Sequence, residues 1–186
     1  IRIIEVKQSV FEDNNKDAEE LRKTLKAEKT FLLNLMSSPG SGKTTTLKAL
    51  AKELSGKLRW AVMEADIDSA VDAEAMISAG VLSIQIHTGG MCHLDADMTR
   101  QGLSQLDTEK FDLVVLENVG NLVCPAEFDT GASKNMTILS VPEGHDKPLK
   151  YPLMYQTCHL LVINKIDVLP YFDFDTQKAV EYARMR

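Results

Sequence analysis

One glycine-rich segment limits the fold of this chain more than any other feature. It runs Ser37-Ser38-Pro39-Gly40-Ser41-Gly42-Lys43-Thr44, between the apolar run Phe31–Met36 and a stretch with helical spacing of apolar residues. Glycines let successive backbone N–H groups point inward, and a helix start adds positive potential, so this order is typical of phosphate-binding loops. The alternative is a glycine-rich turn without a ligand, and the strand–loop–helix setting favours the phosphate loop.

The residue types in this loop also predict individual roles. We expect Lys43 to reach the β- and γ-phosphates of a nucleotide and the hydroxyl of Thr44 to bind Mg²⁺. The usual motif has a glycine five positions before Gly42, where this chain has Ser37, but the Gly-Lys-Thr core is intact. The residues assigned to the nucleotide in this segment are Pro39, Gly40, Ser41, Gly42, Lys43, Thr44 and Thr45.

Apolar runs alternate with amphipathic stretches along the whole chain, and this alternation predicts β-α-β units. The predicted strands are Phe31–Met36, Arg59–Met63, Leu82–Ile86, Asp112–Leu116, Met136–Val141 and His159–Asn164. The predicted helices are Asp17–Lys29, Lys43–Leu54, Ala70–Ala79, Leu94–Leu106 and Thr176–Met185. Strands that are apolar almost throughout are buried on both faces, so residues 1–186 are expected to form one α/β domain. We expect a doubly wound, mainly parallel sheet with helices on both faces, as in P-loop NTPases, and ligands at the carboxyl ends of the strands.

Composition excludes several classes of protein. The formal net charge of −6 argues against a nucleic-acid or membrane-surface partner. No apolar run approaches the roughly 20 residues that span a bilayer, and Ile1–Val10 lacks the pattern of a signal peptide. The three cysteines cannot form a complete set of disulfides, which favours the cytoplasm. Because the chain begins without methionine and stops inside a predicted helix, we expect both termini to be incomplete.

The segment Asn164-Lys165-Ile166-Asp167 ends the last predicted strand and indicates which base the nucleotide carries. An aspartate there can accept hydrogen bonds from N1–H and the 2-amino group of guanine, and adenine offers neither donor. Such a pairing discriminates strongly, on the order of 10⁴-fold, because the wrong base leaves a polar group unpaired. A solvated loop is the alternative, but at a strand end after a phosphate loop the segment favours guanine binding by Asn164, Lys165 and Asp167.

Magnesium requires oxygen ligands, usually one or two carboxylates beside the phosphate oxygens. Asp66 follows the second predicted strand and Glu117 ends the fourth, so these two are predicted to join Thr44 as Mg²⁺ ligands. Asp72 is a candidate for positioning water or acting in a switch, although helix capping explains it equally well. The predicted catalytic set is Lys43, Asp66, Asp72 and Glu117, and Gly120 is predicted to offer a backbone N–H that senses the γ-phosphate.

Two cysteines and a histidine form a candidate metal site. Cys92 and His93 follow the third predicted strand and Cys124 follows the fourth, so both loops leave the sheet at the nucleotide edge. Thiolate and imidazole suit Zn²⁺ or Ni²⁺. The spacing alone is a weak motif, because cysteines are often buried as small apolar residues, as we expect for Cys158. Three ligands leave a four-coordinate ion incomplete, so either water or a second copy of the chain at a dimer interface would supply the fourth.

In combination, these motifs resemble the hydrogenase nickel-insertion GTPases of the HypB family, which belong to the SIMIBI class. The matching segments are Ser37–Thr44, Glu64–Asp66, Cys92–Ala96, Glu117–Pro125, Asp146–Pro152 and Asn164–Asp167, in family order. The resemblance implies a cytoplasmic metallochaperone that binds GTP and GDP with Mg²⁺ and dimerises with GTP. It implies Ni²⁺ or Zn²⁺ bound through Cys92, His93 and Cys124 at the dimer interface, with delivery alongside a HypA-type nickel chaperone to the hydrogenase large-subunit precursor.

Some features found in the HypB family are missing from this sequence, and two alternative functions remain. Residues 1–186 lack the N-terminal cysteine motif and histidine-rich stretch of some relatives, so nickel storage is not expected unless a preceding segment holds them. Without an evident arginine finger, intrinsic GTP hydrolysis should be slow. Lys147 and Lys150 either form a solvated basic loop or reach nucleotide in a dimer. The rivals are a urease-type nickel chaperone, which would need a Cys-Pro-His cluster, and a P-loop small-molecule kinase, which would not need Asn164–Asp167.

Overall fold

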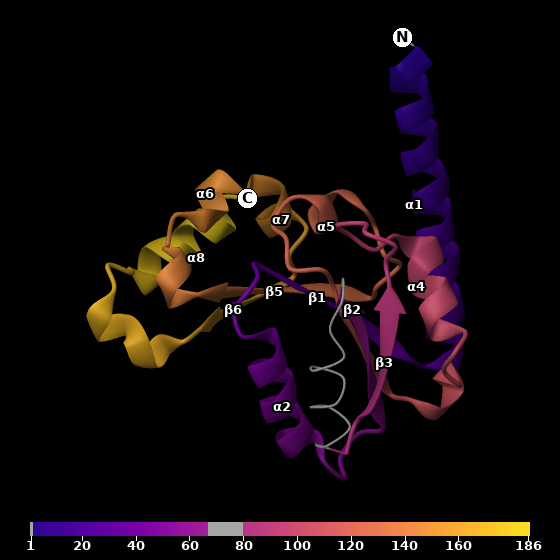
Figure 1. Cartoon of the computed structure of the whole chain (residues 1–186), viewed down its shortest axis with the longest axis horizontal. Helices are drawn as coiled ribbons and strands as arrows, with labels where there is room; N and C mark the ends of the chain where they lie inside the picture. Colours follow the sequence, from indigo (N-terminus) through magenta and orange to yellow (C-terminus); the bar gives the residue numbers. More distant parts are fainter. Residues whose placement is uncertain (1, 67–79) are drawn as a thin grey trace.

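The computed structural model describes residues 2–66 and 80–186, with side chains described for 12–65 and 80–186. Within this part, six strands form one all-parallel sheet in the order β3-β2-β4-β1-β5-β6 (Figure 1). The strands are β1 (Phe31–Ser37), β2 (Trp60–Asp66), β3 (Leu82–His87), β4 (Leu113–Glu117), β5 (Lys134–Ser140) and β6 (Leu160–Asn164). The first strand is central and the chain winds outward from it in both directions, which confirms the doubly wound prediction.

Helices cover both faces of this sheet, as predicted (Figure 1). They are α1 (Arg2–Glu28), α2 (Lys43–Leu54), α4 (Ala96–Leu103), α5 (Cys124–Glu127), α6 (Lys147–Lys150), α7 (Pro152–Gln156) and α8 (Thr176–Arg184). Short 3₁₀ turns span Thr108–Lys110, Val141–Glu143 and Ile166–Tyr171. The apolar side of α2 packs on one face through Leu47 and Ala51, whereas Leu21 and Leu25 of α1 pack on the other. No helix in the described part of the chain is both long and apolar enough to cross a membrane.

Helix α1 departs most from the sequence prediction. The prediction began this helix at Asp17, because Glu12–Lys16 is entirely polar and interrupts the apolar spacing. In the structure the helix begins at Arg2, and Asn14 takes a place on the buried stripe that continues through Ala18 and Leu21. Helix α4 begins at Ala96 rather than Leu94 because Asp95 caps it, accepting a hydrogen bond from the Met98 N–H at 2.8 Å, and it ends at Leu103 rather than Leu106. The predicted helix Ala70–Ala79 lies outside the described residues.

The strand register brings the predicted site segments to one edge. Leu35 of β1 pairs with Glu117 at the end of β4, so the phosphate loop emerges beside that carboxylate. On the other side Ser140 of β5 pairs with Asn164, the last residue of β6. Since all described strands are parallel, their carboxyl ends and the loops that follow them meet along the same edge.

An ion pair fastens the starts of β2 and β4. Asp112 accepts hydrogen bonds from the backbone N–H and guanidinium of Arg59, which lower the pKa of Asp112 from 3.8 to about 2. Because the folded pKa lies below the unfolded one, the pair stabilises the fold above about pH 4, and this contribution is lost as the pH falls toward 2.

We therefore expect Asp112→Asn to lower the thermal unfolding midpoint at neutral pH and to have a much smaller effect at about pH 2. Parallel calorimetry of the two proteins across this range measures the difference. Asp13→Asn is the control. Asp13 likewise forms an exposed ion pair, with Lys16, but this pair does not join two strands. A midpoint difference that stays constant down to low pH would contradict the assignment.

Candidate functional site

The phosphate loop has the backbone that its glycines were expected to provide. Gly40 and Gly42 adopt φ values of 70° and 101°, a left-handed region that glycine enters without strain. Helix α2 begins directly after the loop at Lys43, so its N-terminus points to the same place. The Lys43 ammonium lies 3.9 Å from the carboxylate of Glu117, and both side chains are largely buried. The predicted lysine is therefore held at the end of β4, directly beside the loop.

The phosphate loop and the base segment are in direct contact. Asn164 donates a hydrogen bond through Nδ2 to the carbonyl of Ser41 at 2.8 Å. Lys165 donates through Nζ to the carbonyl of Gly40 at 2.7 Å. Asp167 lies just beyond in an exposed 3₁₀ turn, so its carboxylate is accessible. Asn164 and Lys165 thus hold the loop, and Asp167 remains accessible to a base.

The residues predicted for magnesium are only partly described. Thr44 is half-buried in the first turn of α2, and Glu117 is 7% exposed at the end of β4. Asp66 is the last residue of β2, next to β4 in the sheet, but its side chain is outside the described part, and so is the whole of Asp72. A hydroxyl and a carboxylate at the phosphate loop are the oxygen donors that Mg²⁺ prefers, so the described residues fit the ion.

Gly120 lies against the phosphate loop. A Cβ atom added to Gly120 would lie 3.2 Å from three atoms of Pro39, so only a glycine allows this approach without displacement. Asn118 fixes the turn that brings Gly120 there: its backbone N–H donates to the carbonyl of Leu35, and its Oδ1 accepts from the Val119 N–H. The predicted γ-phosphate sensor therefore touches the loop that it would report on.

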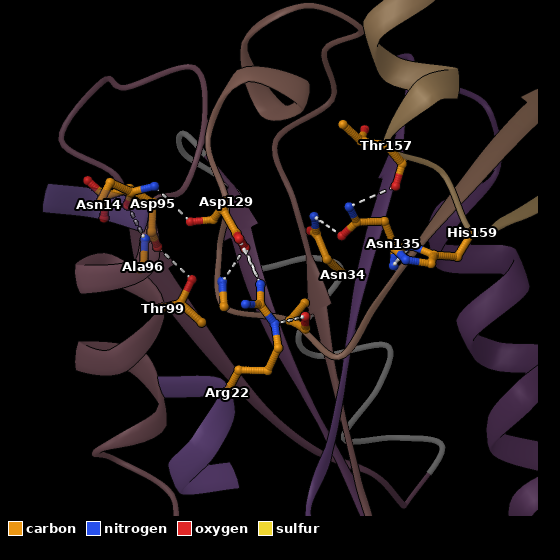
Figure 2. Close-up of polar contacts among 12 residues, drawn as sticks. Asn14, Arg22, Asn34, Asp95, Ala96, Thr99, Asp129, Asn135, Thr157 and His159 are labelled. Carbon is orange, nitrogen blue, oxygen red and sulfur yellow. Dashed lines mark hydrogen bonds and ion pairs between the residues drawn. The ribbon is translucent and has the colours of Figure 1, made fainter. Parts of the chain in front are cut away.

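A row of side-chain amides, two buried and one half-buried, continues from this turn across the sheet. Asn118 donates to Asn34 at 3.1 Å, and Asn34 donates to Asn135 at the same distance. Asn135 in turn donates to the carbonyl of Thr157, and Figure 2 shows this far end of the row. The row was not predicted from the sequence, although Asn34, the single polar residue inside the apolar run Phe31–Met36, indicates a buried hydrogen-bonding group.

Cys92 contacts both its neighbour His93 and Cys124 from the segment after β4, which leaves the sheet at the same edge. The Sγ of Cys92 lies 3.8 Å from Nδ1 of His93. A hydrogen bond between Cys92 and Cys124, followed by burial, raises the pKa of the Cys124 thiol. Burial lowers the pKa of His93, which favours the neutral imidazole that binds metals. These donors suit a borderline-soft ion such as Ni²⁺ or Zn²⁺.

His93 packs against the segment that follows Cys124. The His93 ring is 6% exposed and stacks on Phe128, with ring centroids 3.7 Å apart and an angle of 9° between the planes. Among the described residues, no group of three or more His, Cys, Asp or Glu side chains is arranged to hold a metal ion. Cys158, which was expected in the core, is half-buried and donates to the carbonyl of Leu160 instead.

Known proteins match this chain over nearly its whole length. A model of the CobW/HypB/UreG nucleotide-binding domain matches residues 31–185. The chain belongs to the CobW/HypB/UreG family. The hydrogenase maturation factor HypB of Escherichia coli (strain K12) is 44% identical over 183 residues, a match that covers 98% of this chain and 63% of that protein. This chain thus spans less than two thirds of that relative's length.

Two HypB proteins from Helicobacter are matched more completely. The hydrogenase/urease maturation factor HypB of Helicobacter hepaticus is 41% identical over 184 residues, covering 96% of this chain and 74% of that protein. The crystal structure of HypB from Helicobacter pylori in complex with nickel superposes with a TM-score of 0.87 and 40% identity. That superposition covers 93% of this chain and 81% of that one. The P-loop NTPase fold and the HypB resemblance predicted from sequence are confirmed.

The contact between the phosphate loop and the base segment can be tested by a substitution at Gly42. A methyl group at Gly42 would overlap Nδ2 of Asn164, and φ there is 101°. We expect Gly42→Ala to weaken GDP affinity by about tenfold or more, since such strain costs about 1–3 kcal/mol. Fluorescent GDP titration measures the loss. Gly56→Ala is the matched control, because Gly56 has φ of 71° with nothing within 4 Å of the added methyl. Equal affinities for both variants would contradict the role of the contact.

Asn34 tests whether the amide row stabilises the fold. Asn34→Leu is close in size but leaves Asn118 and Asn135 without their amide partner. We expect the free energy of unfolding to fall by about 1–3 kcal/mol, because buried polar groups lose hydrogen bonds. Urea denaturation at equilibrium measures this change. Ser133→Ala, which removes a single hydrogen bond from the Leu32 N–H nearby, should lose less. An unchanged urea midpoint for Asn34→Leu would show that the row contributes nothing.

Proposed function

We propose that this chain is the GTP-binding part of a nickel-delivering maturation factor for [NiFe] hydrogenase, which hydrolyses GTP to GDP and phosphate. The observation that supports it most is the contact of Cys92 with His93 and with Cys124, on the two segments that follow β3 and β4, at the same sheet edge as the phosphate loop. Because the metal donors and the phosphate loop share one edge of the sheet, nucleotide binding would be able to alter metal binding, and metal binding to alter nucleotide binding.

The chain's own residues would bind and orient the nucleotide. Backbone N–H groups of residues 39–45 and the Lys43 ammonium would hold the phosphates, while Asp167 would pair with guanine. Thr44, Asp66 and Glu117 would hold Mg²⁺, which when bound neutralises charge developing on the phosphate oxygens. Asp72 would orient the attacking water. Since these residues include no arginine finger, turnover would be slow until a partner binds.

The metal would be cargo, bound between two copies of the chain. Cys92, His93 and Cys124 would supply soft donors, and the second copy would complete the coordination of Ni²⁺, or of Zn²⁺ in the isolated protein. GTP with Mg²⁺ would order the loops around Asp66 and Glu117 and so favour the dimer, and hydrolysis would reverse this change. A HypA-type chaperone would supply nickel and a hydrogenase large-subunit precursor would receive it, in the cytoplasm.

Lys147 and Lys150 would take part in this cycle if one of them reaches nucleotide in the dimer. Lys150 now pairs with Asp146 at 2.6 Å, and Lys147 lies over the Tyr151 ring. Both ammonium groups lie on the short helix α6, after the end of β5 at the nucleotide edge. A urease-type chaperone remains the second candidate, because the Helicobacter hepaticus relative is named for both hydrogenase and urease maturation. The hypothesis of a P-loop small-molecule kinase is disfavoured, because Asn164 and Lys165 contact the phosphate loop.

Light scattering after size-exclusion chromatography, with metal assayed across each peak, tests the proposed function. Wild type, Cys92→Ala and Cys158→Ala are compared without nucleotide, with GDP, and with a non-hydrolysable GTP analogue and Mg²⁺. We expect a dimer with bound nickel in the analogue sample, lost in Cys92→Ala and kept in Cys158→Ala, because Cys158 lies outside the cluster. A mass and metal content that ignore both nucleotide and Cys92 would remove the metallochaperone proposal.

A further inference from the structure

We propose that Asn14 of α1 is a positioning residue for the nickel site, because its side-chain amide ties together the two segments that carry Cys92-His93 and Cys124. The inference rests on the proposed function, since it assigns a role around the metal residues named there. Asn14 lies far from them in sequence, on a helix that carries none of the proposed ligands.

Both ends of the Asn14 amide are used, and each reaches a different segment. Oδ1 accepts a hydrogen bond of 2.9 Å from the backbone N–H of Ala96, and Nδ2 donates one of 3.0 Å to the carbonyl of Asp129. Ala96 opens helix α4, three residues beyond His93, and Asp129 follows Cys124 by five residues. Figure 2 shows Asn14 between these two segments. The side chain is thus a bridge between them.

The Asn14 bridge completes a closed circuit of contacts near the metal residues. On one side of this circuit the imidazole of His93 stacks on the phenyl ring of Phe128, the neighbour of Asp129. On the other side Asn14 joins Asp129 to Ala96, and the chain from Ala96 leads back to His93. The two segments therefore cannot move apart unless both the aromatic stack and the hydrogen bonds of Asn14 break. Loss of Asn14 would leave the stack as the remaining tie in this circuit.

Helix α1 can hold the two segments in place because its own position is fixed. Leu21 and Leu25 are buried in the core beneath the sheet face, so the helix cannot shift without opening that core. About two turns after Asn14, Arg22 donates to both carboxylate oxygens of Asp129 at 2.7 Å and to the carbonyl of Ala132 at 3.0 Å. The segment after Cys124 is therefore held at two points on one rigid helix.

An amide is the side chain that this place requires. The Ala96 N–H is one of the first N–H groups of a helix, which find no partner within it, and the Asp129 carbonyl needs a donor. An apolar residue would fill the buried stripe and leave both groups unsatisfied. An aspartate could accept from Ala96 but would repel the carbonyl. Only a neutral group with one donor and one acceptor serves both.

Outer groups that fix metal ligands typically matter about 10–100-fold in metal affinity. We therefore expect Asn14→Leu and Asn14→Asp to weaken nickel affinity by about tenfold or more, and to shift or weaken the nickel–thiolate absorption band. Nickel is titrated into the full chain with a non-hydrolysable GTP analogue and Mg²⁺. Asn14→Asp keeps the bond from Ala96, so it serves where Asn14→Leu fails to fold. Asn15→Ala is the matched control, because Asn15 is the same residue type, adjacent and exposed.

Further readouts separate positioning from stability and from the proposed function itself. GDP affinity should be unchanged in the Asn14 variants, because Asn14 lies outside the nucleotide loop. A lower unfolding midpoint with wild-type nickel affinity and absorption band would mean that Asn14 is only structural, and the inference would be overturned. If Cys92→Ala binds nickel as wild type does, the proposed function fails and the inference fails with it. If nickel binding needs Cys92 but ignores Asn14, the inference alone is wrong.

Discussion

Two side-chain hydrogen bonds, from Asn164 to the carbonyl of Ser41 and from Lys165 to that of Gly40, unite the nucleotide site. They join a loop on the central strand β1 to a segment on β6, two strands away. The phosphate loop can keep its left-handed glycines because its carbonyls are occupied from outside. The parallel sheet is what makes this contact possible, since it delivers every following loop to the same edge.

Neutral amides fix several of the described loops below the surface. Asn118 and Asn34 fix the turn that presents Gly120, and Asn14 joins the segments beyond Cys92-His93 and Cys124. An amide brings one donor group and one acceptor without a charge, so its burial is far less unfavourable than burial of a carboxylate or ammonium. The charged pair of Arg22 and Asp129 lies where water still reaches it, whereas the Lys43–Glu117 pair at the phosphate loop is largely buried.

Local signals made the strands, the phosphate loop and the base segment predictable. The apolar run Phe31–Met36 predicts a largely buried strand from its own composition, and the Gly-Lys-Thr core has few other uses after such a strand. Asn14 could not be predicted, because nothing near it in sequence shows that its partners would be Ala96 and Asp129. The start of α1 was missed for the same reason: Asn14 is buried by tertiary contact and so breaks the apolar period from which the helix was inferred.

The contact of Asn164 and Lys165 with the phosphate loop has a consequence for nucleotide exchange. Both residues belong to the segment that carries Asp167, so a nucleotide that touches both Asp167 and the phosphate loop would stabilise this contact through thermodynamic linkage. In the reverse direction, loss of the two hydrogen bonds would let Asp167 move away from the base while β1 kept its hold on the phosphates. Release would then begin at the guanine end.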